Sequence, residues 1–173
     1  MVNLIQLDTE ERITSLLNIE SFDDAGFVFM ATVKGVVKKT PLEDFRLPRK
    51  NGKRAIKLDA KDELVGTKIT DGKQHIMLIS DAGKAVYFDE KDSRPLGRDT
   101  RGVKGIDLSE EQKVISLMVP SLEDEILTVS ENGYGKKSKI ADFRKTKRGA
   151  KGVIAMQLSE RNGKLISAVQ VLE

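Results

Sequence analysis

The chain repeats itself about every fifty residues, and this periodicity limits its possible folds more than any other feature. Three apolar runs end in a glycine turn, and their glycines, Gly35, Gly83 and Gly133, lie 48 and 50 residues apart. An arginine follows 11 residues after each glycine, at Arg46, Arg94 and Arg144, with an aspartate two residues before it. Several landmarks in one register indicate a repeat architecture.

A third landmark closes each repeat unit. The segments 52–58, 102–108 and 152–158 begin with glycine, end with leucine and are spaced by 50 residues. Residues 2–7 fit the same pattern, so Met1 falls inside a unit. We expect one repeat domain over 1–173, with half a unit at 1–20 and whole units at about 25–70, 73–119 and 124–173. Since a unit buries its apolar face only against neighbours, we expect a fragment of a larger protein.

Each unit predicts four short β-strands. The first strand is apolar and β-branched, as at 27–33, and Asn132-Gly133 favours a type I′ hairpin after it. The second strands are predicted at 36–40, 84–88 and 134–138. The third strands are predicted to end at Leu58, Leu108 and Leu158, and the fourth lie at 64–69, 114–119 and 165–171. Four strands in about fifty residues are typical of a β-propeller blade, so the predicted class is all-β.

Composition removes several classes of function. The chain has no cysteine and one histidine, His75, which excludes disulfides and cysteine-ligated metal sites. No run approaches a membrane span, and no signal peptide is visible. We expect no cofactor, no metal and no membrane partner. An enzyme with a site in a central channel is an alternative, but the first strands are mostly apolar and no nucleophile–base pair stands out.

The charges segregate although the formal net charge is only +3. The turns after Leu7, Leu58 and Leu108 are acidic, whereas the segments that follow the second strands are basic and hold one acid, Asp99. We call 46–57, 94–104 and 144–151 the basic crossing segments. Their cations are the predicted DNA-binding residues: Arg46, Arg49, Lys50, Lys53, Arg54, Arg94, Arg98, Arg101, Lys104, Arg144, Lys145, Lys147, Arg148 and Lys151.

Equivalent positions of a stacked repeat fall on one surface, so the basic crossing segments are predicted to form a continuous belt. Such a belt follows a phosphate backbone through counterion release and needs no base contacts. Two alternatives stay open. The belt can meet an acidic protein partner. Its charges can also be structural, as a solvated face in which Arg46, Arg94 and Arg144 each pair with the repeated aspartate or with an adjacent blade.

The sequence resembles the C-terminal domain of the A subunit of bacterial DNA gyrase, in the type IIA topoisomerase family, with the A subunit of topoisomerase IV as the alternative. The resemblance covers essentially the whole chain. The segments that carry it are Lys34–Leu42, Ser80–Lys84, Gly97–Ile106, Glu131–Lys136 and Ser159–Gly163.

The resemblance implies a six-bladed β-pinwheel whose neighbouring blades exchange strands and whose basic rim wraps duplex DNA with positive handedness. This chain would supply about three and a half blades. The resemblance further implies a non-catalytic domain of an ATP-hydrolysing, DNA-supercoiling isomerase in the bacterial cytoplasm. The remaining gyrase A regions and the gyrase B protein would be its partners. The basic, glycine-rich box that gyrases carry near the start of this domain, and need for wrapping, is absent from the sequence.

Overall fold

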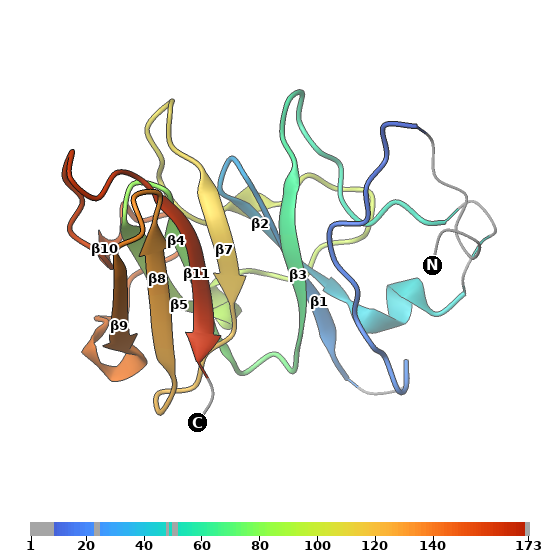
Figure 1. Cartoon of the computed structure of the whole chain (residues 1–173). Coiled ribbons are helices and arrows are strands. Elements are labelled where there is room, and N and C mark those ends of the chain that lie inside the picture. The colour runs from blue at the N-terminus through green and yellow to red at the C-terminus, as the bar shows by residue number, and fades with distance from the viewer. Residues whose placement is uncertain (1–8, 23–24, 48, 50–51, 172–173) are drawn as a thin grey trace.

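A computed structural model describes residues 9–22, 25–47, 49 and 52–171. The described residues form three sheets and three short 3-10 helices, which confirms the all-β prediction (Figure 1). The strands are β1 (Phe27–Thr32), β2 (Val36–Pro41), β3 (Leu64–Thr70), β4 (His75–Ser80), β5 (Lys84–Asp89), β6 (Val103–Lys104), β7 (Val114–Met118), β8 (Glu125–Ser130), β9 (Gly135–Lys139), β10 (Val153–Ile154) and β11 (Leu165–Val171). The 3-10 helices are η1 (Leu42–Phe45), η2 (Glu90–Asp92) and η3 (Ile140–Asp142).

Neighbouring units exchange one strand. The sheet orders are β3-β1-β2-β6, β10-β5-β4-β7 and β11-β8-β9. Each sheet is therefore a hairpin flanked by the fourth strand of its own unit. In the first two sheets the other flank is a strand from the next unit. Val36 pairs with Lys104, and Lys84 pairs with Ile154 at the equivalent register. The strand exchange implied by the family resemblance is confirmed.

The third strand was predicted too long. It spans only Val103–Lys104 and Val153–Ile154, and the segment 52–58 forms no strand. The exchanged strand pairs with its neighbour only beside the hairpin turn, where Gly35 O accepts from Gly105 N–H at 2.7 Å and from Ile106 N–H at 3.3 Å. The segment 52–58 lacks a partner of this kind because the described residues before the first hairpin, 9–22, hold no strand.

The core lies between the sheets. Ile76 and Leu78 of β4 pack with Phe29 and Val37 of the first unit, while Met77 and Ile79 on the opposite face pack with residues of the third unit such as Ile126. Both faces of the middle sheet are thus buried, which explains the continuous apolar run of β4. The exposed large apolar side chains among the described residues lie in 13–69 and 122–169, and none lies in the middle unit.

Candidate nucleic-acid interface

The basic crossing segments lie side by side through hydrogen bonds that repeat with the units. Arg98 Nη1 donates to the carbonyl of Arg54 at 3.4 Å, and Arg148 Nη1 donates to the carbonyl of Lys104 at 2.5 Å. The two donors are 50 residues apart in the sequence, and so are the two acceptors. The backbone repeats the same connection, because Lys57 N–H donates to Thr100 O and Asp107 N–H donates to Ala150 O, both at 2.9 Å.

Most of the predicted cations reach the surface. Lys53, Arg98 and Arg148 are half-buried, and Lys50 lies outside the described residues. The exposed ones are Arg46, Arg49, Arg54, Arg94, Arg101, Lys104, Arg144, Lys145, Lys147 and Lys151. The half-buried arginines use only some of their N–H groups to join neighbouring segments, because a guanidinium has five N–H donors in all. The surface between the joined segments is therefore rich in cations.

Some of these cations already have acidic partners. Arg54 pairs with Asp99 at 3.3 Å, Arg101 with Asp59 at 3.0 Å and Lys104 with Asp107 at 2.9 Å. The hydrogen bond and charge of Lys104 lower the pKa of Asp107. Exposed pairs of this kind contribute little stability, so a phosphate can replace the carboxylate at small cost.

Other cations form no ion pair within the part of the chain that the structure describes: Arg94, Arg144, Lys145, Lys147 and Lys151. Arg94 and Arg144 in particular do not pair with Asp92 and Asp142. The alternative that these repeated arginines neutralise the repeated aspartates is therefore not found in the second and third units.

Lys38 holds two basic crossing segments together, and sequence reasoning did not single it out. Its side chain extends from β2 and is fully buried. The ammonium donates to the carbonyls of Ala55 at 2.7 Å and Thr100 at 3.3 Å, and also to that of Arg98. Burial lowers the pKa of Lys38 from 10.5 to about 8. In the second unit the equivalent residue is Val86, which packs in the core.

We expect Lys38→Met to lower the free energy of unfolding by about 1–3 kcal/mol, because carbonyls of both segments lose a buried donor. This loss of stability, relative to the parent chain, should grow with pH. Between about 8 and 10.5 the unfolded chain binds a proton at Lys38 that the folded chain does not, so this group makes the parent chain more stable as pH rises through that window. Urea unfolding across this pH range measures both effects. Lys136→Met, at the exposed equivalent position, should change stability by less than about 0.5 kcal/mol.

Tyr87 and His75 take packing roles. Tyr87 is buried in the core, and desolvation raises its pKa. The ring of His75 lies 5.2 Å from that of Tyr87. The described residues contain no group of three or more acidic or histidine side chains able to hold a metal ion. Among the same residues, no helix has the length and apolar character needed to cross a bilayer.

Comparison with known proteins identifies relatives along the whole chain. The A subunits of DNA gyrase from Klebsiella oxytoca and Escherichia coli K12 are 46% and 47% identical to it over 171 residues. Those 171 residues are 99% of this chain and 20% of each relative. The chain therefore spans about a fifth of the length of these curated relatives.

Solved structures have the same fold. The C-terminal domain of DNA topoisomerase IV matches with a TM-score of 0.91 at 29% identity, over 99% of this chain and 54% of that one. The DNA gyrase A C-terminal domain matches with a TM-score of 0.86 at 28% identity, over 99% of this chain and 57% of that one.

A family model supplies the assignment. The model for the DNA gyrase C-terminal domain, a β-propeller, matches residues 26–71, 74–121 and 124–171. The three matched stretches correspond to the three sheets, apart from the exchanged strands. Together with the relatives above, this match confirms the resemblance seen in the sequence. The chain belongs to the DNA gyrase C-terminal domain family.

Proposed function

We propose that this chain is a non-catalytic module that binds duplex DNA with little sequence preference and bends or wraps it. In the longer protein it would support ATP-dependent negative supercoiling, together with the other gyrase A regions and the gyrase B protein, in the bacterial cytoplasm. The observation that carries the proposal is the repeated bond from Arg98 to Arg54 O and from Arg148 to Lys104 O. Bonds at equivalent positions, 50 residues apart, support one cationic track along the basic crossing segments.

The chemistry of the track favours phosphate over bases. Its groups are flexible lysines, guanidiniums and the backbone of glycine-containing loops, which neutralise charge and position a duplex without reading its sequence. The track runs along units that exchange strands, so a duplex that contacts the whole track must follow its path. Bending a site of 20–30 base pairs costs on the order of 1–6 kcal/mol, which added phosphate contacts offset.

The proposal is tested by closing nicked plasmid with ligase in the presence of the protein. We expect a positive shift in the topoisomer distribution, because a chiral wrap changes the linking number of the closed circle. The shift and the binding should both decrease with salt, and log K should fall by about 0.9 per phosphate contact for each unit of log salt concentration. Binding without a topoisomer shift would limit the function to DNA binding by this length of chain.

A competition experiment separates DNA from an acidic protein partner. If the track is built for a duplex, linear duplex DNA should compete far better than heparin or polyglutamate at equal charge. Nuclease digestion should then leave a protected duplex footprint. Equal competition by all three polyanions, with no footprint, would contradict the proposal and favour a protein-interaction propeller.

A further inference from the structure

The ammonium of Lys38 lies where the first two basic crossing segments meet, a contact that we call the first junction. Lys38 Nζ donates to the carbonyl of Ala55 at 2.7 Å and to that of Thr100 at 3.3 Å. It donates to the carbonyl of Arg98 as well. Since a lysine ammonium has three N–H donors, these three carbonyls use all of them. One buried side chain therefore connects the first segment at one point and the second segment at two.

Each of these carbonyls belongs to, or lies next to, an arginine of the cationic track. Ala55 follows Arg54, and Thr100 precedes Arg101. The guanidiniums of Arg54 and Arg101 are exposed, and so are the carboxylates with which they pair. Arg98 donates from its own side chain to Arg54 O at 3.4 Å. The backbone that carries these arginines is therefore held in place by one buried ammonium.

The contact between the second and third basic crossing segments, the second junction, is closed without a lysine. There Gly149 N–H donates to Gly105 O at 2.7 Å. Ala55 O, which is 50 residues before Gly105 O, accepts from Lys38 Nζ at the same distance. Val86 takes the place of Lys38 and packs in the apolar core. An ammonium thus supplies at the first junction a bond that a backbone N–H group supplies at the second.

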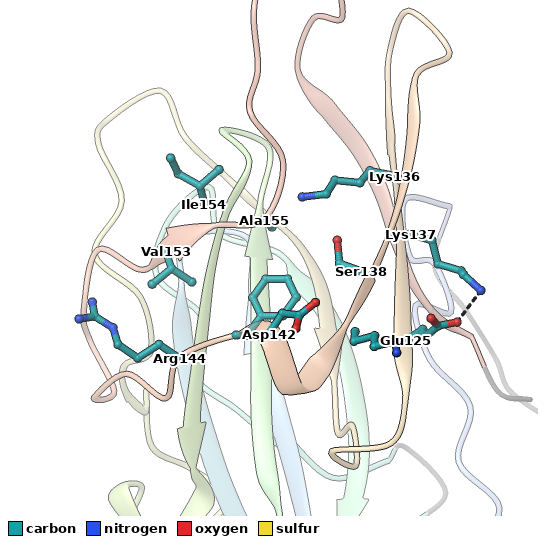
Figure 2. A pocket seen from close by; sticks show the side chains of 11 residues that line it. Glu125, Lys136, Lys137, Ser138, Asp142, Arg144, Val153, Ile154 and Ala155 are labelled. Atoms are coloured by element: carbon teal, nitrogen blue, oxygen red, sulfur yellow. Dashed lines mark ion pairs between the residues drawn. The ribbon is translucent and has the colours of Figure 1, made fainter.

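The crossing segments pass directly over these strand positions. A Cβ at Gly102 would lie 3.2 Å from Cβ of Lys38, and a Cβ at Gly152 would lie 3.3 Å from Cγ1 of Val86. The equivalent residue of the third unit, Lys136, is exposed and lines a groove of about 530 Å³ (Figure 2). A lysine at this position is therefore covered in the first unit, and its charge acts on the segments from inside.

The surroundings of Lys38 favour loss of its proton at moderately alkaline pH. Burial lowers the pKa to about 8, against the attraction of Asp99 and of Asp44 in η1, while the charge of Arg98 lowers it further. A neutral amine has two N–H donors for three carbonyls. Deprotonation therefore leaves one carbonyl of the junction without its bond and removes the charge that strengthens the other two.

We propose that Lys38 is a positioning residue for DNA binding, whose ammonium holds Arg54 and Arg101 at the spacing that lets both contact one duplex. The inference rests on the proposed function. When the ammonium is removed, the two segments lose their common donor. The exposed ion pairs of the two arginines are too weak to replace it, so the segments separate and the phosphate contacts at the first junction are lost.

DNA binding by Lys38→Met, measured well below its melting temperature, tests the inference. Fluorescence anisotropy should show an affinity about tenfold weaker, and a slope of log K against log salt concentration less steep by about 1–2. Lys113→Met removes one exposed cation from a turn, and Ile79→Val removes a buried methyl group from the core. These controls reproduce the change in net charge and a loss of stability, and both should keep the parent's affinity.

The pH profile separates positioning from stability. The parent's affinity should fall as pH rises through about 8, and Lys38→Met should lack this fall, because the titrating group is gone. Binding by Lys38→Met that matches the parent, in affinity and in pH dependence, would overturn the inference and leave the proposed function standing. A parent chain that does not bind duplex DNA would instead refute the proposed function.

Restoring the ammonium chemically gives the sharpest test. The chain has no cysteine, so Lys38→Cys carries a single thiol that can be alkylated in the unfolded state before refolding. With 2-bromoethylamine the thiolate sulfur displaces bromide and gives a side chain of lysine length that ends in an ammonium. With 1-bromopropane it gives an apolar side chain of the same length. The first product should bind DNA like the parent and the second like Lys38→Met, and equal affinities would overturn the inference.

Discussion

Reversing the charges of Arg94, Lys147 and Lys151 together is expected to weaken the binding of duplex DNA for every sequence tested. All three side chains are exposed and lie on crossing segments that run beside one another, since Arg148 Nε donates to Asp92 O at 2.9 Å. Losing three phosphate contacts should make the slope of log K against log salt concentration less steep by about 3. Fluorescence anisotropy with two unrelated duplexes over a salt series measures the change.

The matched control reverses Lys73, Lys113 and Lys164, which are equally exposed but lie on the turns before first and fourth strands. This variant has the same net charge as the first one. If charge alone governed binding, the two variants would lose affinity equally. Affinity that survives in the control and is lost in the first variant assigns the DNA to the basic crossing segments. Arg98 and Arg148 are unsuitable for this test because their guanidiniums join neighbouring segments.

Replacing Glu90 by alanine is expected to be the most destabilising single change. Glu90 is fully buried in η2, and its carboxylate accepts from Thr70 Oγ1 at 2.7 Å and from Gln74 N–H at 2.8 Å. Lys39 Nζ lies 3.9 Å away and is itself almost fully buried. Removing one partner of a buried ion pair costs about 3–5 kcal/mol, which lowers the melting temperature by about 10 °C in a chain of this length. Calorimetry or thermal circular dichroism gives the value.

The repeat provides the control for this variant. Leu42 and Ile140 are buried at the positions equivalent to Glu90, so the other units pack an apolar residue there. The double variant Lys39→Met with Glu90→Leu should recover most of the stability lost by Glu90→Ala, because it removes both buried charges together. A double variant as unstable as the single one would mean that the bonds to Thr70 and Gln74 dominate.

The periodic landmarks were enough to predict the architecture. Apolar runs and the glycine turns located the first, second and fourth strands to within a residue or two, since local hydrogen bonding and burial determine these strands. The third strand was extended too far because its pairing depends on the preceding unit, and a single sequence does not display that partner. The exchange of strands between units was predicted only from the family resemblance.

The sequence predicted which residues form the candidate site, but not the hydrogen bonds that join them. Equal spacing of cations indicated one surface, and the structure brings the described segments together. It also separates Arg98 and Arg148, which join segments, from Lys147 and Lys151, which do not. The burial of Lys38 and Lys39 was not predicted, because lysines within a strand suggest an edge that faces solvent. Their burial depends on acceptors of other segments: the carbonyls of Ala55 and Thr100 for Lys38, and Glu90 for Lys39.

The exchange of β6 and β10 between units has a consequence for how the protein comes apart. A unit that opens takes its third strand away from the sheet before it, so local opening of one unit exposes a strand edge in the preceding unit. Such edges are templates for pairing with other chains. Partial unfolding of one unit should therefore destabilise its neighbour or lead to pairing with another molecule, and should not stay confined to one repeat.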